Sequence, residues 1–336
     1  MLVGIAPLRI SFAGGGTDLE EYHNKYDGFS ISATINKFTY VFAKLRQDNK
    51  IQSFSPDFAS HLPPKVFREI SAPQGHEIIL TCLKEMKFKK GTDMFFCSDV
   101  SPGSGLGASS SMTTNLIQVI LELQHKKWNK NKIAMKAYSI GHDALKWGIG
   151  KQDEFAAAYG GINLYKFTKK KVTVNSLRLS KNTLKELQSN SLLFHIGFRG
   201  HSSKILKRQV KNIKNSSKVT LEALHRQKEI ALDISNSLKK NDITKFIELV
   251  KNGWEEKKKY ANGITNNHIE KICQLSYLNG ANALKVTGAG GGGHLYVLAK
   301  PSKHKKLEKS LKKLGVERVP FCFTNQGVKV IYLNDK

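Results

Sequence analysis

Residues 101–111 read SPGSGLGASSS and separate two predicted elements, a strand over 93–100 and a helix that starts at 112. At such a junction the unpaired N–H groups of the first helical turn and the positive end of the helix dipole point at one place, where a phosphate binds well. The alternative is an ordinary helix cap made by the serines. Such a cap does not need Gly103, Gly105 and Gly107 together, so the sequence predicts a phosphate-binding loop.

Two common phosphate-binding motifs do not explain this loop. A Walker A motif is absent, because no lysine follows these glycines. The pattern GxGxx(G/A) of dinucleotide-binding proteins does match Gly103, Gly105 and Ala108. That motif needs an acidic residue about 20 positions later, at the end of the next strand. Residues 122–130 (ELQHKKWNK) are helical in pattern and basic instead.

Two further glycine clusters follow strand-like runs. Residues 13–18 (AGGGTD) come after a predicted strand over 2–12, and residues 285–293 (KVTGAGGGG) stand between strands predicted at 283–287 and 294–299. A glycine-rich hairpin or bulge would also explain the second cluster. Four consecutive glycines cost more backbone entropy than a mere turn requires, so the close approach of a ligand is the better interpretation.

A fourth stretch, residues 150–161 (GKQDEFAAAYGG), places an acidic residue among small ones. Asp153 is a candidate general base for a hydroxyl group, with Lys151 or Arg9 tuning its charge. A surface carboxylate at the start of a helix, where it suits the helix dipole, is an equal alternative from the residues alone.

The remaining pattern alternates strands and helices, which predicts an α+β protein of two layered lobes with a boundary near 180–190. We expect the N-terminal lobe over 1–185 and the C-terminal lobe over 186–336. Expected strands include 31–45, 160–167, 172–177, 192–197 and 328–333. Expected helices include 78–86, 131–147, several over 202–263, and one that ends at 278. Residues 47–75 contain four prolines and are predicted to form an irregular connection.

Composition narrows the class of protein. The 336 residues suggest about two domains. The net charge of +27 would suit nucleic acid or an anionic membrane, but the excess is lysine rather than arginine and is spread along the chain. In residues 303–314 (KHKKLEKSLKKL) the leucines form one helical stripe, which makes the lysines a solvated face. We therefore expect no nucleic-acid partner, and a small anionic substrate remains compatible with the charge.

The sequence also predicts the compartment. No apolar run approaches the roughly 20 residues of a membrane-spanning helix, and the first residues lack the pattern of a signal peptide. The four cysteines are far apart with no CxxC pair, which argues against a structural zinc site or a disulfide framework. We predict a cytoplasmic protein with no membrane partner, as a monomer or homodimer.

Three motifs in order, at 6–18 (APLRISFAGGGTD), 102–111 and 285–293, resemble those of the GHMP kinases over nearly the whole chain. The resemblance implies a ribosomal-protein-like N-terminal lobe, a ferredoxin-like C-terminal lobe, ATP on the second motif and substrate in the cleft between lobes. The first motif together with residues 150–161 is most similar to the branch that phosphorylates D-glycero-D-manno-heptose 7-phosphate, a small sugar phosphate, at its anomeric hydroxyl. Kinases of fucose or galactose, or a catalytically inactive nucleotide- or sugar-binding relative, stay open as alternatives.

The resemblance also implies residue roles. Asp153 matches the catalytic aspartate, and Arg9 matches an arginine that offsets charge near the transferred phosphoryl group. Ser109 matches the serine that ligates Mg²⁺. The implied ATP-binding residues are Pro102, Gly103, Ser104, Gly105, Leu106, Gly107, Ala108, Ser109 and Ser110. The implied substrate-binding residues are Gly14, Gly15, Gly16, Thr17, Asp18, Gly288, Gly290 and Gly291.

The chain departs from the family at one point. Many relatives carry a glutamate, a second Mg²⁺ ligand, before the catalytic aspartate, and Gly141 stands at that position here. Asp143 is a candidate replacement, or Asp153 and water complete the shell, since Mg²⁺ readily keeps several waters. A substrate phosphate would need a cationic pocket, for which Arg199 in residues 197–204 (GFRGHSSK) is the candidate. An ordinary helix cap is the alternative there.

Overall fold

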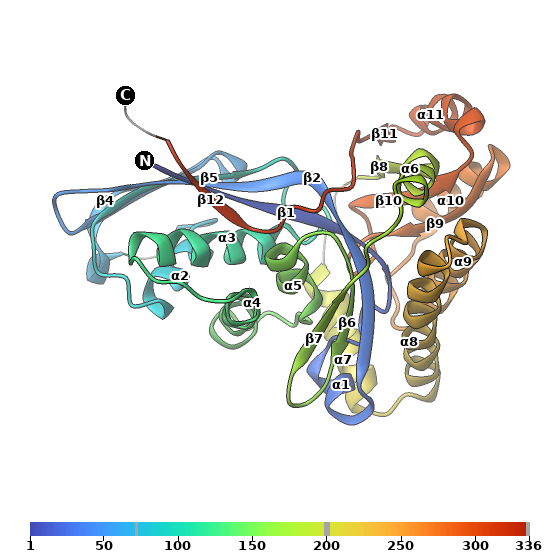
Figure 1. Cartoon of the computed structure of the whole chain (residues 1–336), viewed down its shortest axis with the longest axis horizontal. Coiled ribbons are helices and arrows are strands. Elements are labelled where there is room, and N and C mark those ends of the chain that lie inside the picture. Colours follow the sequence, from blue (N-terminus) through green and yellow to red (C-terminus); the bar gives the residue numbers. More distant parts are fainter. Residues whose placement is uncertain (71–72, 198–201, 334–336) are drawn as a thin grey trace.

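The computed structural model describes residues 1–70, 73–197 and 202–333, which form two sheets with helices packed on them (Figure 1). The first sheet is built on two long antiparallel strands, β1 (Leu2–Ala13) and β2 (Gly28–Leu45), with α1 (Glu20–Tyr26) between them. Nearly every residue of β1 is buried, because the strand has neighbours on both edges and helices over it. This strand carries the first motif into the centre of the molecule.

The described part of the first sheet has eight strands. Six have the order β12-β1-β2-β5-β3-β4, β6 also pairs with β2, and β7 pairs with β6. Its other strands are β3 (Lys50–Ser55), β4 (Ser60–Val66), β5 (Thr92–Ser98), β6 (Ile162–Phe167), β7 (Val172–Ser176) and β12 (Lys329–Tyr332). On one side of this sheet lie α2 (Glu77–Glu85), α3 (Ala108–Leu123), α4 (Lys130–Ser139) and α5 (Gln152–Tyr159), as Figure 1 shows.

The second sheet has the order β11-β8-β10-β9 and is antiparallel. Its strands are β8 (Ser191–His195), β9 (Ala281–Val286), β10 (His294–Ala299) and β11 (Glu317–Arg318). The helices of this half are α6 (Lys181–Asn190), α7 (Ser202–Lys214), α8 (Lys218–Lys239), α9 (Ile243–Lys258), α10 (Asn267–Leu278) and α11 (His304–Lys312). Two sheets with separate sets of helices confirm the predicted α+β class.

One hydrophobic core joins the two halves. Phe12 at the end of β1 packs edge-on against Phe246 of α9, with ring centroids 5.1 Å apart, and lies 5.8 Å from Tyr296 of β10. The same core includes residues of β1, β2, α8, α9 and β10. The two halves therefore pack against each other through shared apolar side chains.

Two predictions of local structure are wrong. Residues 47–75 contain the strands β3 and β4 and two short 3₁₀ helices rather than an irregular connection. Pro63 and Pro64 are tolerated because β4 is an edge strand and the two prolines lie at the shift in its register with β3, between the paired residues Leu62 and Lys65. A single helix is predicted over 131–147. The α-helix ends at Ser139 instead, and one π-helical turn, Ile140–Ala144, follows it.

The C-terminal strand does not stay with the second sheet. β12 pairs antiparallel with β1, so the end of the chain completes the sheet of the N-terminal half. The division at residues 185 and 186 falls within α6 and stays a prediction. Among the described residues, every helix is too short or too polar to cross a membrane.

Candidate active site

A cavity of about 260 Å³ lies where the three glycine clusters meet. Its wall includes Gly15 and Gly16 of the first cluster, residues 103–110 of the second apart from Leu106, and Gly288 of the third. The fold thus brings Gly16 and Gly288, which are 272 positions apart in the sequence, to the same cavity. The shared core between the halves fixes this arrangement.

The second cluster forms the start of α3. Gly103, Gly105 and Gly107 all have φ near +80°, in the left-handed region that favours glycine, so the backbone winds tightly before the first helical turn. Gly107 is the N-terminal cap residue, and no side chain caps the helix. Ser109 and Ser110 of the first turn line the cavity. Free N–H groups and hydroxyl groups therefore face the cavity from a helix N-terminus, which is an anion-binding arrangement.

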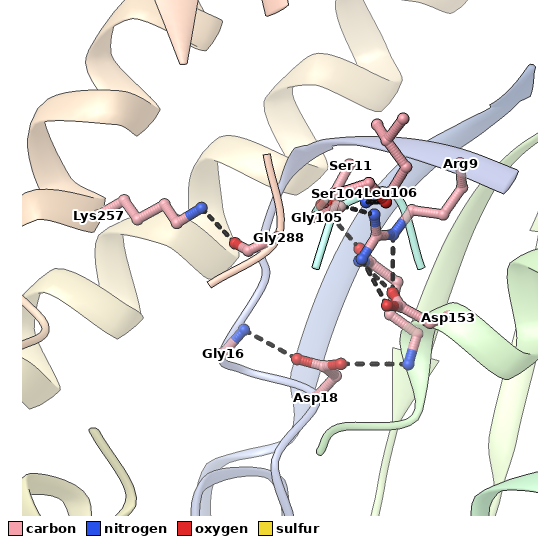
Figure 2. A network of polar contacts seen from close by, with 11 residues as sticks. Arg9, Ser11, Gly16, Asp18, Ser104, Gly105, Leu106, Asp153, Lys257 and Gly288 are labelled. Carbon is pink, nitrogen blue, oxygen red and sulfur yellow. Dashed lines mark hydrogen bonds and ion pairs between the residues drawn. The ribbon is translucent and has the colours of Figure 1, made fainter. Parts of the chain in front are cut away.

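Arg9 and Asp153 form a bidentate ion pair beside this loop (Figure 2). Arg9 Nε donates to Asp153 Oδ1 at 2.7 Å and a terminal nitrogen donates to Oδ2 at 2.5 Å. The other terminal nitrogen donates to the carbonyl oxygen of Gly105 at 2.8 Å. The Arg9 side chain is 6% exposed and that of Asp153 is 24% exposed. The arginine thus fixes both a carboxylate that reaches the cavity and the loop next to it.

A second carboxylate, Asp18, lies across from this pair (Figure 2). It accepts hydrogen bonds from the N–H of Gly16 at 2.8 Å and from the N–H of Gln152 at 3.1 Å. Burial, followed by the charge of Asp153, raises the pKa of Asp18. A Cβ on Gly150 would lie 2.1 Å from Asp18 Oδ2, so this glycine makes room for the carboxylate.

Some predicted substrate-binding residues have structural contacts instead of lining the cavity. Gly14 donates its N–H to Gln227 Oε1 at 2.8 Å, and the Thr17 hydroxyl donates to the Gly14 carbonyl at 2.8 Å. A Cβ on Gly290 would lie 2.7 Å from the Ile264 carbonyl oxygen, and one on Gly291 would lie 2.6 Å from a side-chain carbon of Ile205. These residues shape the first and third loops. Gly15, Gly16, Asp18 and Gly288 are the predicted substrate-binding residues that reach the cavity.

Three further predicted residues lie away from the cavity wall that the described residues form. Pro102 is exposed, and Leu106 is buried with its carbonyl accepting from the Arg9 N–H at 3.0 Å. The Asp143 side chain is 67% exposed and contacts His142 Nδ1 at 2.8 Å in the π-helical turn. Arg199 lies outside the described residues.

The cavity wall also includes polar residues that the sequence analysis did not select, namely Ser11, Gln152, Gln209, Gln227, Lys257, Tyr260 and Lys285. Lys285 stands inside the third motif and Gln152 precedes Asp153, so both could have been found by position. Ser11 lies on β1 inside the first motif and could have been found in the same way. Gln209, Gln227, Lys257 and Tyr260 come from α7, α8, α9 and the segment after α9, where no local pattern marks them. Lys257 donates to the carbonyls of Val286 at 3.0 Å and Gly288 at 2.5 Å, which anchors the third loop (Figure 2).

The donor set can be compared with the needs of Mg²⁺. No group of three His, Cys, Asp or Glu residues suited to a metal occurs in the described part of the chain. Mg²⁺ keeps several waters and is usually held by one or two carboxylates and by substrate phosphates. The Ser109 hydroxyl and the Asp153 carboxylate line the same cavity as the anion-binding loop, so these oxygens fit a cation that enters with a nucleotide. Asp143 does not reach them.

The third loop also holds the second in place, which gives a testable prediction. His294 Nδ1 lies 2.8 Å from the Ser104 carbonyl oxygen. Gly293 has φ +88°, and a Cβ there would lie 2.5 Å from the same oxygen. We expect Gly293→Ala to weaken binding of an ATP analogue by roughly tenfold, about 1.4 kcal/mol, as measured by calorimetry. Gly148→Ala is the control, since nothing lies within 4 Å of that Cβ. Equal affinities of the two variants would contradict the role of this contact.

Glu154 gives a prediction about pH. It is 1% exposed, and its Oε2 has no hydrogen-bond partner among the described residues. Burial, followed by the charge of Asp153, raises the pKa of Glu154 to about 8. The folded protein therefore keeps a proton that the unfolded chain releases above the ordinary glutamate pKa of 4.5, so stability falls as pH rises between these values. Between pH 5 and pH 7 the wild type should lose about 2 kcal/mol of its free energy of unfolding through this titration, and Glu154→Gln should not lose this amount.

Thermal unfolding at pH 5 and pH 7 measures this difference as roughly 4 °C in Tm. Lys285 does not confound the comparison, because its pKa is lowered to about 7 and its own titration changes stability mainly above that pH. Parallel pH profiles of the wild type and the variant would show that Glu154 is ionised in the folded protein.

An anion-binding loop beside a carboxylate that an arginine holds, with a second carboxylate opposite, is suited to a phosphotransferase of the kinase class. The chain belongs to the GHMP kinases: residues 76–161 match the family model of the GHMP kinases N terminal domain, and residues 234–317 match that of the GHMP kinases C terminal domain. The predicted family, its two-lobed fold and the expectation of an enzyme are confirmed.

Known relatives agree with this assignment over the full length. The chain is 32% identical to D-glycero-alpha-D-manno-heptose 7-phosphate kinase of Campylobacter jejuni, and the alignment covers 96% of each. A solved structure of a D-glycero-D-manno-heptose 1-phosphate kinase from Bacteroides thetaiotaomicron superposes with a TM-score of 0.83, at 25% identity and 100% coverage of both chains. A putative sugar kinase from Campylobacter jejuni superposes with a TM-score of 0.78, at 31% identity and 98% coverage of both.

Proposed function

We propose that this protein transfers the γ-phosphoryl group of ATP to the anomeric hydroxyl of D-glycero-D-manno-heptose 7-phosphate, which gives the 1,7-bisphosphate. The observation that carries the proposal is the Arg9–Asp153 pair at the N-terminus of α3, with Asp18 on the opposite wall. The heptose substrate is supported by the relative from Campylobacter jejuni, which matches the chain over 96% of its length.

Each part of the cavity has a task in this reaction. The N–H groups and serine hydroxyls at the start of α3 bind the nucleotide phosphates. Asp18, already oriented by two backbone N–H groups, accepts hydrogen bonds from sugar hydroxyls. Asp153 accepts the proton of the anomeric hydroxyl as that oxygen attacks phosphorus. Arg9 offsets negative charge next to the transferred group, and such positioning and electrostatics account for most of the catalysis of phosphoryl transfer.

Mg²⁺, held by Ser109, Asp153 and the phosphates, would neutralise charge on the nucleotide when it is bound. The phosphate of the sugar needs cationic residues of its own, and Arg199 remains the candidate from the sequence. The four free cysteines fit a reducing cytoplasm, which is the location we propose.

Two alternatives have different signatures. A kinase of another sugar, such as fucose or galactose, would not require a phosphate on its acceptor. An inactive relative that binds nucleotide or sugar is suggested by Gly141 and by the exposed position of Asp143, since neither supplies a second metal ligand at the cavity. Such a protein would bind ATP without turnover.

The test is ADP release from MgATP with a panel of acceptors, run with the wild type and with Asp153→Ala. The panel contains heptose 7-phosphate, heptose 1-phosphate, mannose, galactose, fucose and mevalonate. We expect turnover with heptose 7-phosphate alone and its loss in the variant. Turnover with a sugar that carries no phosphate would contradict the heptose assignment and would identify that sugar as the acceptor. Binding of ATP with no turnover on the whole panel would favour the inactive relative.

A further inference from the structure

The third motif places a lysine in the cleft between the two halves. Lys285, on β9, lines the cavity and is 4% exposed. Its ammonium group donates to the carbonyl oxygen of Phe12, at 2.7 Å, near the end of β1. Because β9 belongs to the second sheet and β1 to the first, this side chain crosses from one half of the protein to the other next to the first glycine cluster.

The charge of Lys285 has no counter-charge in the described part of the protein. None of the ion pairs among the described residues involves it, and the Phe12 carbonyl is its one hydrogen-bond partner there. Arg9, the nearby cation of the cavity, is neutralised by Asp153. An ammonium group can donate three hydrogen bonds, and burying one without a carboxylate is costly. Burial, followed by the charge of Arg9, lowers the pKa of Lys285 to about 7.

The geometry also indicates where an anion would bind. The chain just after β9 lies against the phosphate-binding loop, because Thr287 donates its N–H to the carbonyl of His294, whose Nδ1 lies 2.8 Å from the Ser104 carbonyl oxygen. Lys285, two residues before Thr287, lines the same cavity as Arg9. Arg9 is also the charge that acts on Lys285, and it holds the Gly105 carbonyl of the phosphate-binding loop. Lys285 therefore lines the same cavity as the phosphate-binding loop.

We propose that Lys285 is a catalytic residue whose ammonium group contacts the phosphoryl group that passes from the nucleotide to the acceptor. The inference rests on the proposed phosphoryl transfer and adds a second cation to it. Arg9, paired with Asp153, supplies orientation and a partly neutralised charge. Lys285 supplies the uncompensated positive charge that three equatorial phosphoryl oxygens require, and it keeps its hydrogen bond to Phe12 while doing so.

The decisive measurement compares calorimetric binding of MgAMP-PNP and MgADP, because the two nucleotides differ in the group that Lys285 would contact. We expect Lys285→Met to weaken MgAMP-PNP roughly tenfold, in line with a lost charge-assisted hydrogen bond, and to leave MgADP within about twofold. Lys285→Arg should restore most of the difference. Lys258→Met is the matched control. Lys258 follows Lys257 on α9, and its ammonium group already pairs with the Glu255 carboxylate.

Two other outcomes would overturn the proposal. An unchanged preference for MgAMP-PNP, together with a raised KM for the sugar phosphate and an unchanged kcat, would assign Lys285 to the phosphate of the acceptor. A fall in Tm of the free Lys285→Met protein, with both nucleotides weakened equally, would make the residue a structural link to Phe12. We expect Tm to stay equal or rise, because the variant removes a buried unpaired charge. The nucleotide measurements need no acceptor, so they test Lys285 even if heptose 7-phosphate is not the substrate.

Discussion

Asp153→Asn is expected to lower kcat by about 10³-fold while the protein remains folded and binds MgATP. The amide keeps the size of the carboxylate and can still accept one hydrogen bond from Arg9, but it cannot accept the proton of the acceptor hydroxyl. The substitution also removes the negative charge that neutralises Arg9, whose side chain is 6% exposed. The measurement is the initial rate of ADP release with heptose 7-phosphate, together with the KM for each substrate.

The control is another change of aspartate to asparagine at the start of a helix. Asp242 caps α9 by accepting from the N–H of Lys245 at 2.8 Å, and asparagine caps a helix equally well. Asp242→Asn should therefore retain the activity of the wild type. If Asp153→Asn kept more than about a tenth of the wild-type kcat, the general base would have to be another group, and the leading role given to this carboxylate would be wrong.

The parts of the site that could be predicted from sequence are those whose chemistry is local. Glycine occurs at the alternate positions 103, 105 and 107 because the backbone before α3 is left-handed at each of them. The glycine pattern makes this need visible in the sequence itself. Asp153 could be selected as a carboxylate among small residues at a helix start. The sequence leaves Lys151 and Arg9 as alternative partners, and the fold chooses Arg9, which is 144 residues away, while Lys151 pairs with Glu20.

The predictions that the structure did not support depend on long-range packing. Gly290 and Gly291 have the same local pattern as Gly288, yet they pack on Ile264 and Ile205 while Gly288 reaches the cavity. Nothing in a run of glycines tells which of them will face a ligand. In the same way, the prolines of residues 47–75 indicated a loop, because the sequence does not show that β4 would become an edge strand.

The pairing of Arg9 with Asp153 leads to the second large effect. Arg9→Met is expected to lower kcat by roughly 10² to 10³-fold, because it removes a charge that stabilises the transferred phosphoryl group and also releases Asp153 and the Gly105 carbonyl. Arg9→Lys should recover little of this loss. A lysine ammonium is a point donor and cannot reproduce the two parallel hydrogen bonds to the carboxylate together with a third to the loop.

A double-mutant cycle separates the two roles of Arg9. If its main task is to hold Asp153 in place, Arg9→Met combined with Asp153→Asn should be little worse than Asp153→Asn alone, because the second change has nothing left to orient. If Arg9 acts chiefly on the phosphoryl group, the two losses should multiply. The three hydrogen bonds of Arg9, two to Asp153 and one to the loop, favour the first result. Losses in kcat that multiply fully would show that Arg9 and Asp153 act independently in the reaction, and that Arg9 acts on the phosphoryl group rather than by holding Asp153.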